Sequence, residues 1–462
     1  MQRLGPQDAS FIYLETPSVH QHVGGVAVLD PSTRPDGTLR YDNLLQVMGS
    51  RIHLAPRFRQ KVVFPPFAVA RPVWVDDPNF DLTFHVRRAA LPSPRGRQEL
   101  IDYVQRVFSR PLDRTKPLWE AYIIEEMEND LCAVITKVHH AMVDGLAAID
   151  IASTMFDFTP DVQILTPPPW EAEPEPSRAD LLREAIREQV ANPVKTAIEL
   201  GQRTLQAPSR VLRQVTDVVE GLFDVVGGGV LAPPSPLNRK VGPNRRFGMT
   251  EAPVQTFKDI KNALGGTVND VVLATVAGAI HHLFRSRREP TRDRALRAMV
   301  PVSVRSESES GGNRVSSIFV DLPIGPMGAA KKRLALIREE TKHLKESHYA
   351  VGAEFIMNVG MWAPPTIHAM AARLAARSRV INLVVSNVPG PQVPMYIGGA
   401  RLLAQYPFMP IAESMGLSIA VTSLAGTMAF GVTADWDTLP DIEVLVQGID
   451  EALAELRKSA GK

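Results

Sequence analysis

The sequence predicts an α/β protein made of two lobes. Short apolar runs rich in valine and isoleucine alternate with segments of helical spacing, which is typical of α/β folds. The chain has 462 residues, more than one hydrophobic core usually spans. Residues 159–176 contain six prolines, which predicts an extended crossover. We therefore expect an N-terminal lobe at 1–160, a proline-rich crossover with linker helices at 161–245, and a C-terminal lobe at 246–462.

The first lobe is expected to alternate strands with amphipathic helices. Apolar spacing predicts helices at 41–53 and 98–108. Strands are expected at 23–29, at 73–76 and 80–87 as a pair, at 121–125, and in an apolar run that ends at His139. The last two follow each other closely, so we expect them to be neighbours in a sheet. In the linker, helical spacing covers 177–205 and 209–226.

The second lobe is expected to contain a long apolar helix at 271–284, preceded by Gly265 and Gly266. Two interpretations of its start remain open: the glycines cradle a phosphate, or Asn269 caps the helix. A nucleotide P-loop is not supported, because no Gly-Lys-Ser/Thr follows. Further strands are expected at 298–304, 315–322, 380–385, 417–422 and 427–434, and further helices at 329–345 and 440–456.

Composition excludes several classes of protein. Lys and Arg number 51 against 50 for Asp and Glu, so the strong basic excess of a nucleic-acid-binding protein is absent. The single Cys132 cannot form an internal disulfide and fits a reducing cytosol. The apolar stretch at 271–280 is shorter than the roughly 20 residues of a membrane span, and the N-terminus lacks a signal-peptide pattern. We expect a cytoplasmic protein that meets membranes only peripherally.

The pattern HHxxxDG is the strongest chemical signal in the chain. It comprises His139, His140, Asp144 and Gly145, directly after an apolar run that predicts a strand. Imidazole is the side chain best suited to move a proton near neutral pH. A nearby carboxylate can fix the orientation of a ring or of its loop. The pattern therefore makes His140 a candidate general base and Asp144 its structural support.

A simpler interpretation of the same residues is that the histidines end a strand while Asp144 caps the following helix. Side chains of successive strand residues point to opposite faces, so both rings cannot easily enter one site. For this reason we expect His139 to pack behind His140. A metal site that uses both histidines is not expected either, and no other ligand spacing supports one.

Several further motifs occur in a fixed order over nearly the whole chain. They are Pro117-Leu118-Trp119-Glu120, the HHxxxDG pattern, Asn269-Asp270, Pro301-Val302-Ser303, Asn313-Arg314 and Ser386-Asn387-Val388-Pro389-Gly390-Pro391. Together they resemble the bacterial wax ester synthase/acyl-CoA:diacylglycerol acyltransferase family, and most of all its mycobacteria-type triacylglycerol synthases. The Asp-Phe-Gly-Trp-Gly signature of plant-type acyltransferases is absent, and Ala434-Asp435-Trp436-Asp437 is no obvious substitute.

The resemblance implies a two-lobed fold like that of chloramphenicol acetyltransferase and condensation domains, with His140 in a tunnel between the lobes. It also implies long-chain acyl-CoA as donor and diacylglycerol or a fatty alcohol as acceptor, with no cofactor. His140 would accept the hydroxyl proton and return it to the CoA thiolate. Asn269, Ser386 or a backbone amide would face the oxyanion. Asp270, Trp119 and Asn387 enter as supporting or substrate-binding residues through the resemblance alone.

Apolar products predict work at the inner membrane face or at a lipid-droplet surface. Candidate contacts are the linker helices and the Met/Trp-rich segment 357–370, for which tunnel lining or core is an equal alternative. Arg239, Lys240, Arg245 and Arg246 could meet anionic lipid or CoA phosphates, or form a merely solvated cluster. Two rival functions remain open: a condensation-type transferase that takes its acyl group from a carrier protein, and a lipid-binding protein without catalysis.

Overall fold

The computed structural model describes residues 1–143, 154–187, 231–291, 294–303, 315–325, 330–346, 369, 373, 377 and 379–461. Over these ranges the strands form a seven-stranded sheet, a six-stranded sheet and a small three-stranded sheet. The predicted helix after Asp144, most of the linker helices, the Asn313-Arg314 motif and most of the segment 357–370 lie outside the described residues.

The seven-stranded sheet collects the predicted strands of the first lobe. Across the sheet the order is β5 (Val86–Ala89), β6 (Trp119–Ile124), β7 (Cys132–His139), β2 (His22–Asp30), β14 (Ala400–Phe408), β13 (Tyr396–Ile397) and β8 (Phe156–Asp157). β6 and β7 are neighbours in the sheet, as predicted, and pair antiparallel with Trp119 opposite Val138. β2 flanks β7 on its other side and places His22 opposite His139. The histidine-bearing end of β7 therefore has a strand on each side.

This half of the molecule has four described helices, and the two longest are those that the apolar spacing predicts. The four are α1 (Pro6–Leu14), α2 (Tyr41–Arg51), α3 (Leu82–His85) and α4 (Arg97–Ser109), of which α2 and α4 are the predicted ones. Single 3-10 turns accompany them: η1 (Pro31–Thr33), η2 (Ile52–Leu54), η3 (Pro56–Arg59), η4 (Pro66–Ala68), η5 (Glu128–Asp130) and η6 (His140–Met142). In α4 the buried residues Leu100, Val104 and Val107 follow helical spacing, so one face packs on the sheet. The small sheet has the order β1 (Gln2–Arg3), β4 (Val73–Asp76) and β3 (Gln60–Val63).

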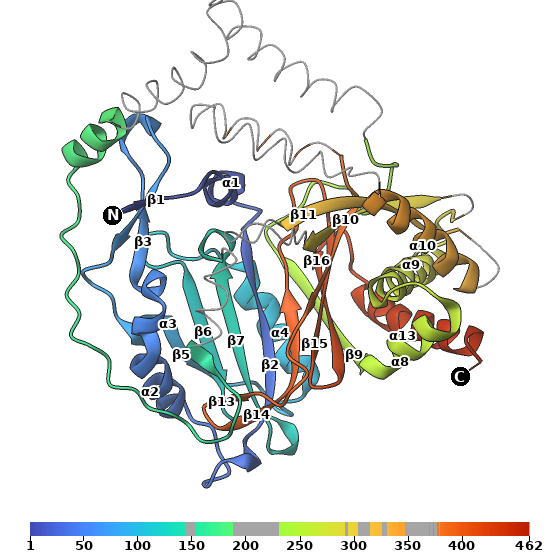
Figure 1. Cartoon of the computed structure of the whole chain (residues 1–462), viewed down its shortest axis with the longest axis horizontal. Helices are drawn as coiled ribbons and strands as arrows, with labels where there is room; N and C mark the ends of the chain where they lie inside the picture. The colour runs from blue at the N-terminus through green and yellow to red at the C-terminus, as the bar shows by residue number, and fades with distance from the viewer. Residues whose placement is uncertain are drawn as a thin grey trace, which may run out of the picture.

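The six-stranded sheet belongs to the second half of the chain. Its order is β11 (Val315–Pro323), β10 (Ala295–Ser303), β12 (Leu383–Pro389), β15 (Leu417–Leu424), β16 (Thr427–Asp435) and β9 (Arg245–Pro253). The described helices beside it are α8 (Val254–Leu264), α9 (Val268–Ser286), α10 (Ala330–Glu346) and α13 (Ile442–Ser459). Helix α9 is buried on nearly all sides, because α8, α10 and α13 surround it on the sheet. In Figure 1 these four helices lie together on one flank, while α2 and α3 lie on the other.

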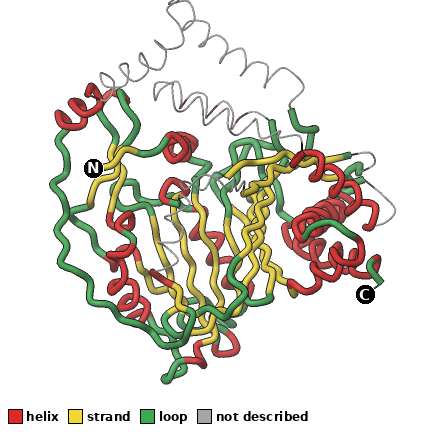
Figure 2. The backbone as a smooth tube through the Cα atoms, viewed as in Figure 1, coloured by secondary structure: helices red, strands yellow, loops and turns green. Residues whose placement is uncertain are grey.

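The two large sheets stand side by side between these flanks (Figure 2). One apolar cluster joins them: Phe108 of α4 stacks on Phe408 of β14, with ring centroids 3.7 Å apart, and Phe247 of β9 packs beside them. The close approach of β14 to the second sheet requires a glycine. A Cβ at Gly431 would lie 1.7 Å from the carbonyl oxygen of Pro407.

The structure corrects two of the predicted elements. Residues 80–87 do not form a strand paired with 73–76: Asp81 caps the short helix α3 by accepting the amide hydrogen of Thr83, and β5 begins only at Val86. β5 pairs with β6 instead. The strand predicted at 380–385 lies further along the chain: β12 spans Leu383–Pro389, so Ser386 to Pro389 form its second half, paired along β15.

Several strands were not predicted, above all β9, β13 and β14. β13 and β14 lie in the seven-stranded sheet although they come late in the chain. The division at residues 160 and 246 stays a prediction. Among the described helices none is by itself long and apolar enough to cross a membrane; α8 and α9 meet that test only together and are bent by 100°.

Candidate active site

The two adjacent histidines sit where β7 passes into the 3-10 turn η6. The backbone N–H of His139 donates to the carbonyl of Leu118, 2.9 Å away, and that of His140 donates to the carbonyl of Gln21, at 2.7 Å. One bond leads toward β6 and the other toward β2, so the backbone of the pair is held from both sides. Asp144 and Gly145 lie outside the described residues.

The His139 ring holds the turn together. Its Nδ1 accepts the amide hydrogen of Ala141 at 3.0 Å, so the ring proton is assigned to Nε2, which lies 3.3 Å from Oε1 of Glu15. Glu15 also accepts from the amide of Gln21 at 2.9 Å and pairs with Arg114 at 2.5 Å. Burial alone would raise the pKa of Glu15, but His139, Arg114 and the Gln21 amide together lower it to about 2. His139 is thus a buried, paired residue that positions the next one.

The His140 ring has different surroundings. It stacks on Phe11 of α1, with ring centroids 3.9 Å apart and an interplanar angle of 23°. Burial lowers the pKa of His140 to about 4, so the ring is neutral at pH 7. Its Nδ1 has no hydrogen-bond partner within the described part of the chain. A neutral imidazole with an unused nitrogen is the form in which a histidine can accept a proton.

Trp119 lies at the start of β6, buried beside the histidine pair. Its indole N–H donates to the carbonyl of Phe58 at 2.9 Å, and its ring stacks on His85 at 4.5 Å. Nδ1 of His85 lies 2.8 Å from the carbonyl oxygen of Trp119. These contacts fix Trp119 as part of the core that supports β6 and β7.

The Asn269-Asp270 motif opens helix α9, but Asn269 is not its cap. Thr267 is the N-cap, and it forms a capping box with Asp270: each backbone N–H donates to the other side chain, at 2.8 and 3.2 Å. The predicted cap was wrong because Thr267 offers its hydroxyl three residues before Asp270. Oδ1 of Asp270 also accepts from the hydroxyl of Thr341, 2.8 Å away on α10. Asp270 is therefore a structural residue.

Asn269 is left to face β12. Its Oδ1 accepts from Nδ2 of Asn387 at 3.3 Å, which joins two motifs separated by 118 residues. Ser386 precedes Asn387 in β12, so its side chain points to the opposite face of the strand; it is buried and lies opposite Ala420 of β15. The contacts found among these described residues link them to one another and not to His140.

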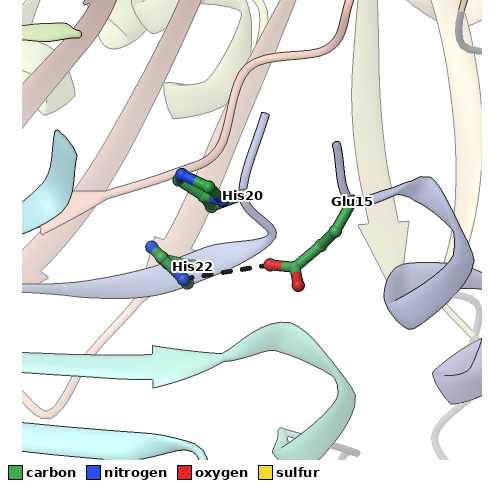
Figure 3. Close-up of side chains that lie close together, drawn as sticks. All are labelled: Glu15, His20 and His22. Atoms are coloured by element: carbon green, nitrogen blue, oxygen red, sulfur yellow. Dashed lines mark ion pairs between the residues drawn. The ribbon is translucent and has the colours of Figure 1, made fainter. Parts of the chain in front are cut away.

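A histidine cluster next to the active-site turn was not predicted. Figure 3 shows Glu15, His20 and His22 facing one another, and one ligand atom of each lies within 4.8 Å of the others. Burial lowers the pKa of both histidines, that of His20 to about 4, so both are neutral. The signal that could have revealed the cluster is the His-x-His spacing at the start of β2, which puts both rings on the same side of an extended chain.

A divalent cation is disfavoured in this cluster by the charges around it. Arg114 already occupies one oxygen of Glu15. Lys137 and Arg245 are close enough to depress the pKa of His20 as well. Three neighbouring positive charges would repel a metal ion.

Taken together, two large mixed sheets flanked by helices, with a neutral histidine just after β7, fit the two-lobed acyltransferase fold. The chain matches the wax ester synthase/diacylglycerol acyltransferase catalytic domain over residues 4–272 and the C-terminal domain of the same enzymes over residues 311–457. It belongs to this family and is an acyltransferase.

Relatives and solved structures agree with the assignment. A protein of Mycobacterium tuberculosis named as a diacylglycerol O-acyltransferase is 33% identical over 99% of this chain and 90% of its own length. The M. tuberculosis diacylglycerol O-acyltransferase tgs1 is 30% identical over 99% and 96%. The wax ester synthase/diacylglycerol acyltransferase of Marinobacter aquaeolei VT8 superposes with a TM-score of 0.70 at 26% identity, covering both chains fully. A starter condensation domain of rhizomide synthetase shares the fold, with a TM-score of 0.56 at 14% identity over 100% and 95% of the two chains.

Proposed function

We propose that the protein transfers a long-chain acyl group from acyl-CoA to the free hydroxyl of diacylglycerol, with His140 as general base. The observation that carries the proposal is the neutral His140 ring with an unused nitrogen, on a turn fixed by its neighbours. The full-length relatives named as diacylglycerol O-acyltransferases support the choice of acceptor.

The reaction needs one proton carrier. As the hydroxyl oxygen attacks the thioester carbonyl, its proton passes to His140 and a tetrahedral oxyanion forms. The carbon–sulfur bond then breaks, and the proton passes from His140 to the CoA thiolate, giving the ester and free CoA. The oxyanion requires hydrogen-bond donors. We propose the buried hydroxyl of Ser386 for this role, because its face of β12 is the one on which Val384 packs against Val19 of the first lobe, opposite the face that carries the Asn269–Asn387 pair.

We also propose that the enzyme works at a lipid surface, because both the acceptor and the product are apolar. Two aromatic side chains are exposed on the segment that follows β3: Phe64 is 47% and Phe67 88% exposed. Such side chains cost little in water singly but can insert into an interface. These are described residues, in contrast to most of the linker helices and most of segment 357–370.

The test is turnover of labelled long-chain acyl-CoA by the purified protein, with diacylglycerol and hexadecanol offered separately. His140→Ala is the test variant, and His343→Ala, an exposed histidine on α10, is the matched control. We expect triacylglycerol from wild type and from the control, and none above background from His140→Ala. Ester formation from hexadecanol would extend the function to wax esters.

Two outcomes would overturn the proposal. Wild type that uses only carrier-protein-bound acyl groups would indicate a condensation-type transferase, an alternative that has the same fold. Wild type that binds lipid but turns over neither donor would indicate a lipid-binding protein.

A further inference from the structure

A groove of about 800 Å³ lies where the two halves of the molecule meet, and its lining does not include the histidine pair. Helix α4 forms one wall, and the start of β9 with the end of β16 forms the other. Its lining includes Asp102, Gln105, Arg106, Arg110, Arg245 and Trp436.

Positive charge dominates this lining. Arg106 and Arg110 are exposed, lie one helical turn apart at the end of α4, and have no ion pair among the described residues. The carboxylate of Asp102 is engaged by the side-chain amides of Gln98 and Gln105, at 3.0 and 3.3 Å. The guanidinium groups are therefore free to bind an anion.

An aromatic plane faces the charges. The ring of Trp436 is 41% exposed, although large apolar side chains are usually covered. Arg246 lies over this ring, 4.0 Å from its centroid, and its Nε donates to the carbonyl of Trp436 at 3.0 Å. Arg245 and Arg246 were both predicted to belong to a basic cluster that meets anions or solvent. Arg245 is instead buried, while Arg246 lies beside the groove, over the Trp436 ring.

The floor of the groove is tied to the strand that ends in the histidine pair. The buried Lys137 of β7 donates from Nζ to the carbonyls of Val107 and Arg110, at 2.9 and 2.5 Å. Arg245 donates to the carbonyl of Ser18, at 2.5 Å, just before the histidine cluster. Lys137 precedes His140 by three residues, which is about 10 Å along an extended strand.

We propose that this groove binds the phosphate-bearing nucleotide of the acyl-CoA donor. Arg106 and Arg110 would hold phosphate oxygens, since guanidinium forms strong charge-assisted hydrogen bonds to them, and the Trp436 ring would stack on the adenine. The pantetheine arm would then run along the lobe junction and present the thioester to His140. This inference rests on the proposed function, because it assumes that CoA carries the acyl group. A phospholipid headgroup would supply the phosphate but no purine for Trp436.

The test compares two donors with the same acyl chain: acyl-CoA, and the acyl thioester of N-acetylcysteamine, which lacks the nucleotide. The variants are Arg106→Ala/Arg110→Ala and Trp436→Ala; Arg457→Ala, an exposed arginine on α13, is the matched control. The readout is the preference for acyl-CoA, the ratio of kcat/KM for the two donors. We expect the double variant to lower this ratio about tenfold or more, mainly through KM, and the control to keep it. Adenosine 3′,5′-bisphosphate should compete with acyl-CoA in wild type and lose this effect in the double variant.

An unchanged ratio in both variants, or a loss shared equally by the two donors, would overturn the groove as the nucleotide site. Lost binding to phosphatidylglycerol vesicles with an unchanged ratio would reassign the groove to lipid headgroups. If wild type used neither thioester, the proposed function itself would fail. Direct binding of adenosine 3′,5′-bisphosphate and of vesicles to wild type and the double variant would still show whether the groove binds the nucleotide.

Discussion

The turn after β7 carries His140 of the HHxxxDG motif, and the start of α9 carries Asp270 of the Asn269-Asp270 motif. The hydrogen bonding of these two polar side chains differs. At α9 every oxygen of the Asp270 carboxylate is occupied, one by the backbone of Thr267 and one by Thr341. At η6 the His140 ring keeps a buried nitrogen without a partner among the described residues and stacks on Phe11. Other buried ring nitrogens, such as Nε2 of His85, also lack a partner, so the unpaired nitrogen of His140 makes it a candidate base only together with its neutral ring and its motif, whereas the full pairing of Asp270 indicates a structural role.

His140→Gln is the strongest test of this contrast. It should lower kcat about 10²–10⁴-fold, the range of one lost general base, and leave thermal unfolding nearly unchanged. Turnover and Tm would be measured on the same preparation. A large fall in Tm with residual activity would place His140 among the structural residues and remove the contrast.

The pH dependence of turnover tests whether His140 is the buried, neutral base. Because burial lowers the pKa of His140 to about 4, the ring stays neutral as the pH falls from 7 to 5, and protonation removes the base only near pH 4. We expect kcat/KM to be flat over pH 5–7 and to fall below that range. A midpoint near 6.5, about the value of an exposed histidine, would contradict the buried setting.

Glu15→Gln tests the ion-pair network that holds His139, the residue before the proposed base. The pKa of Glu15 is lowered to about 2 in the folded protein from its ordinary value of 4.5, so the carboxylate contributes stability above pH 4.5 that is lost as the pH falls toward 2. This contribution is about 3 kcal/mol near neutral pH. Denaturant unfolding at pH 7 should show a loss of that order, and the variant's stability should depend less on pH between 4.5 and 2. A second readout is kcat, which should fall less than in His140→Gln.

Asp270→Ala tests the opposite region. Loss of the capping box and of the Thr341 bond should lower the free energy of unfolding by about 1–3 kcal/mol. Asn269→Ala, one residue earlier and outside the capping box, is the matched control for stability. If the two variants unfolded alike, Asp270 would not be the structural member of its motif.

Phe67→Ser is expected to have the smallest effect on the folded protein. The side chain is 88% exposed, so Tm should hardly move, while partition onto phospholipid vesicles should drop severalfold. Phe158→Ser, at 68% exposure on another part of the surface, serves as the control. Equal vesicle binding by wild type and Phe67→Ser would remove this residue from the lipid contact.

Local patterns predicted most of the regular elements. Helical spacing predicted α2, α4, α10 and α13 to within a few residues, and apolar runs predicted β2, β7, β15 and β16. Patterns failed where a single polar side chain decided the outcome, as at Asp81, which turns a strand-like stretch into α3. They failed also at β9 and β14, whose residues become a strand only by pairing with distant partners.

The sequence by itself determined the family and the candidate base, because the motifs are local and lie in a fixed order along the chain. Only the tertiary structure decided which polar groups meet. Glu15 faces His139, Asn387 reaches Asn269, and Arg245 binds the loop at Ser18. Each of these contacts joins distant parts of the chain, and no periodicity encodes such a separation. The low pKa of Glu15 follows from its pairing in the folded chain, and burial lowers the pKa of His140, so that its ring is neutral and can accept a proton.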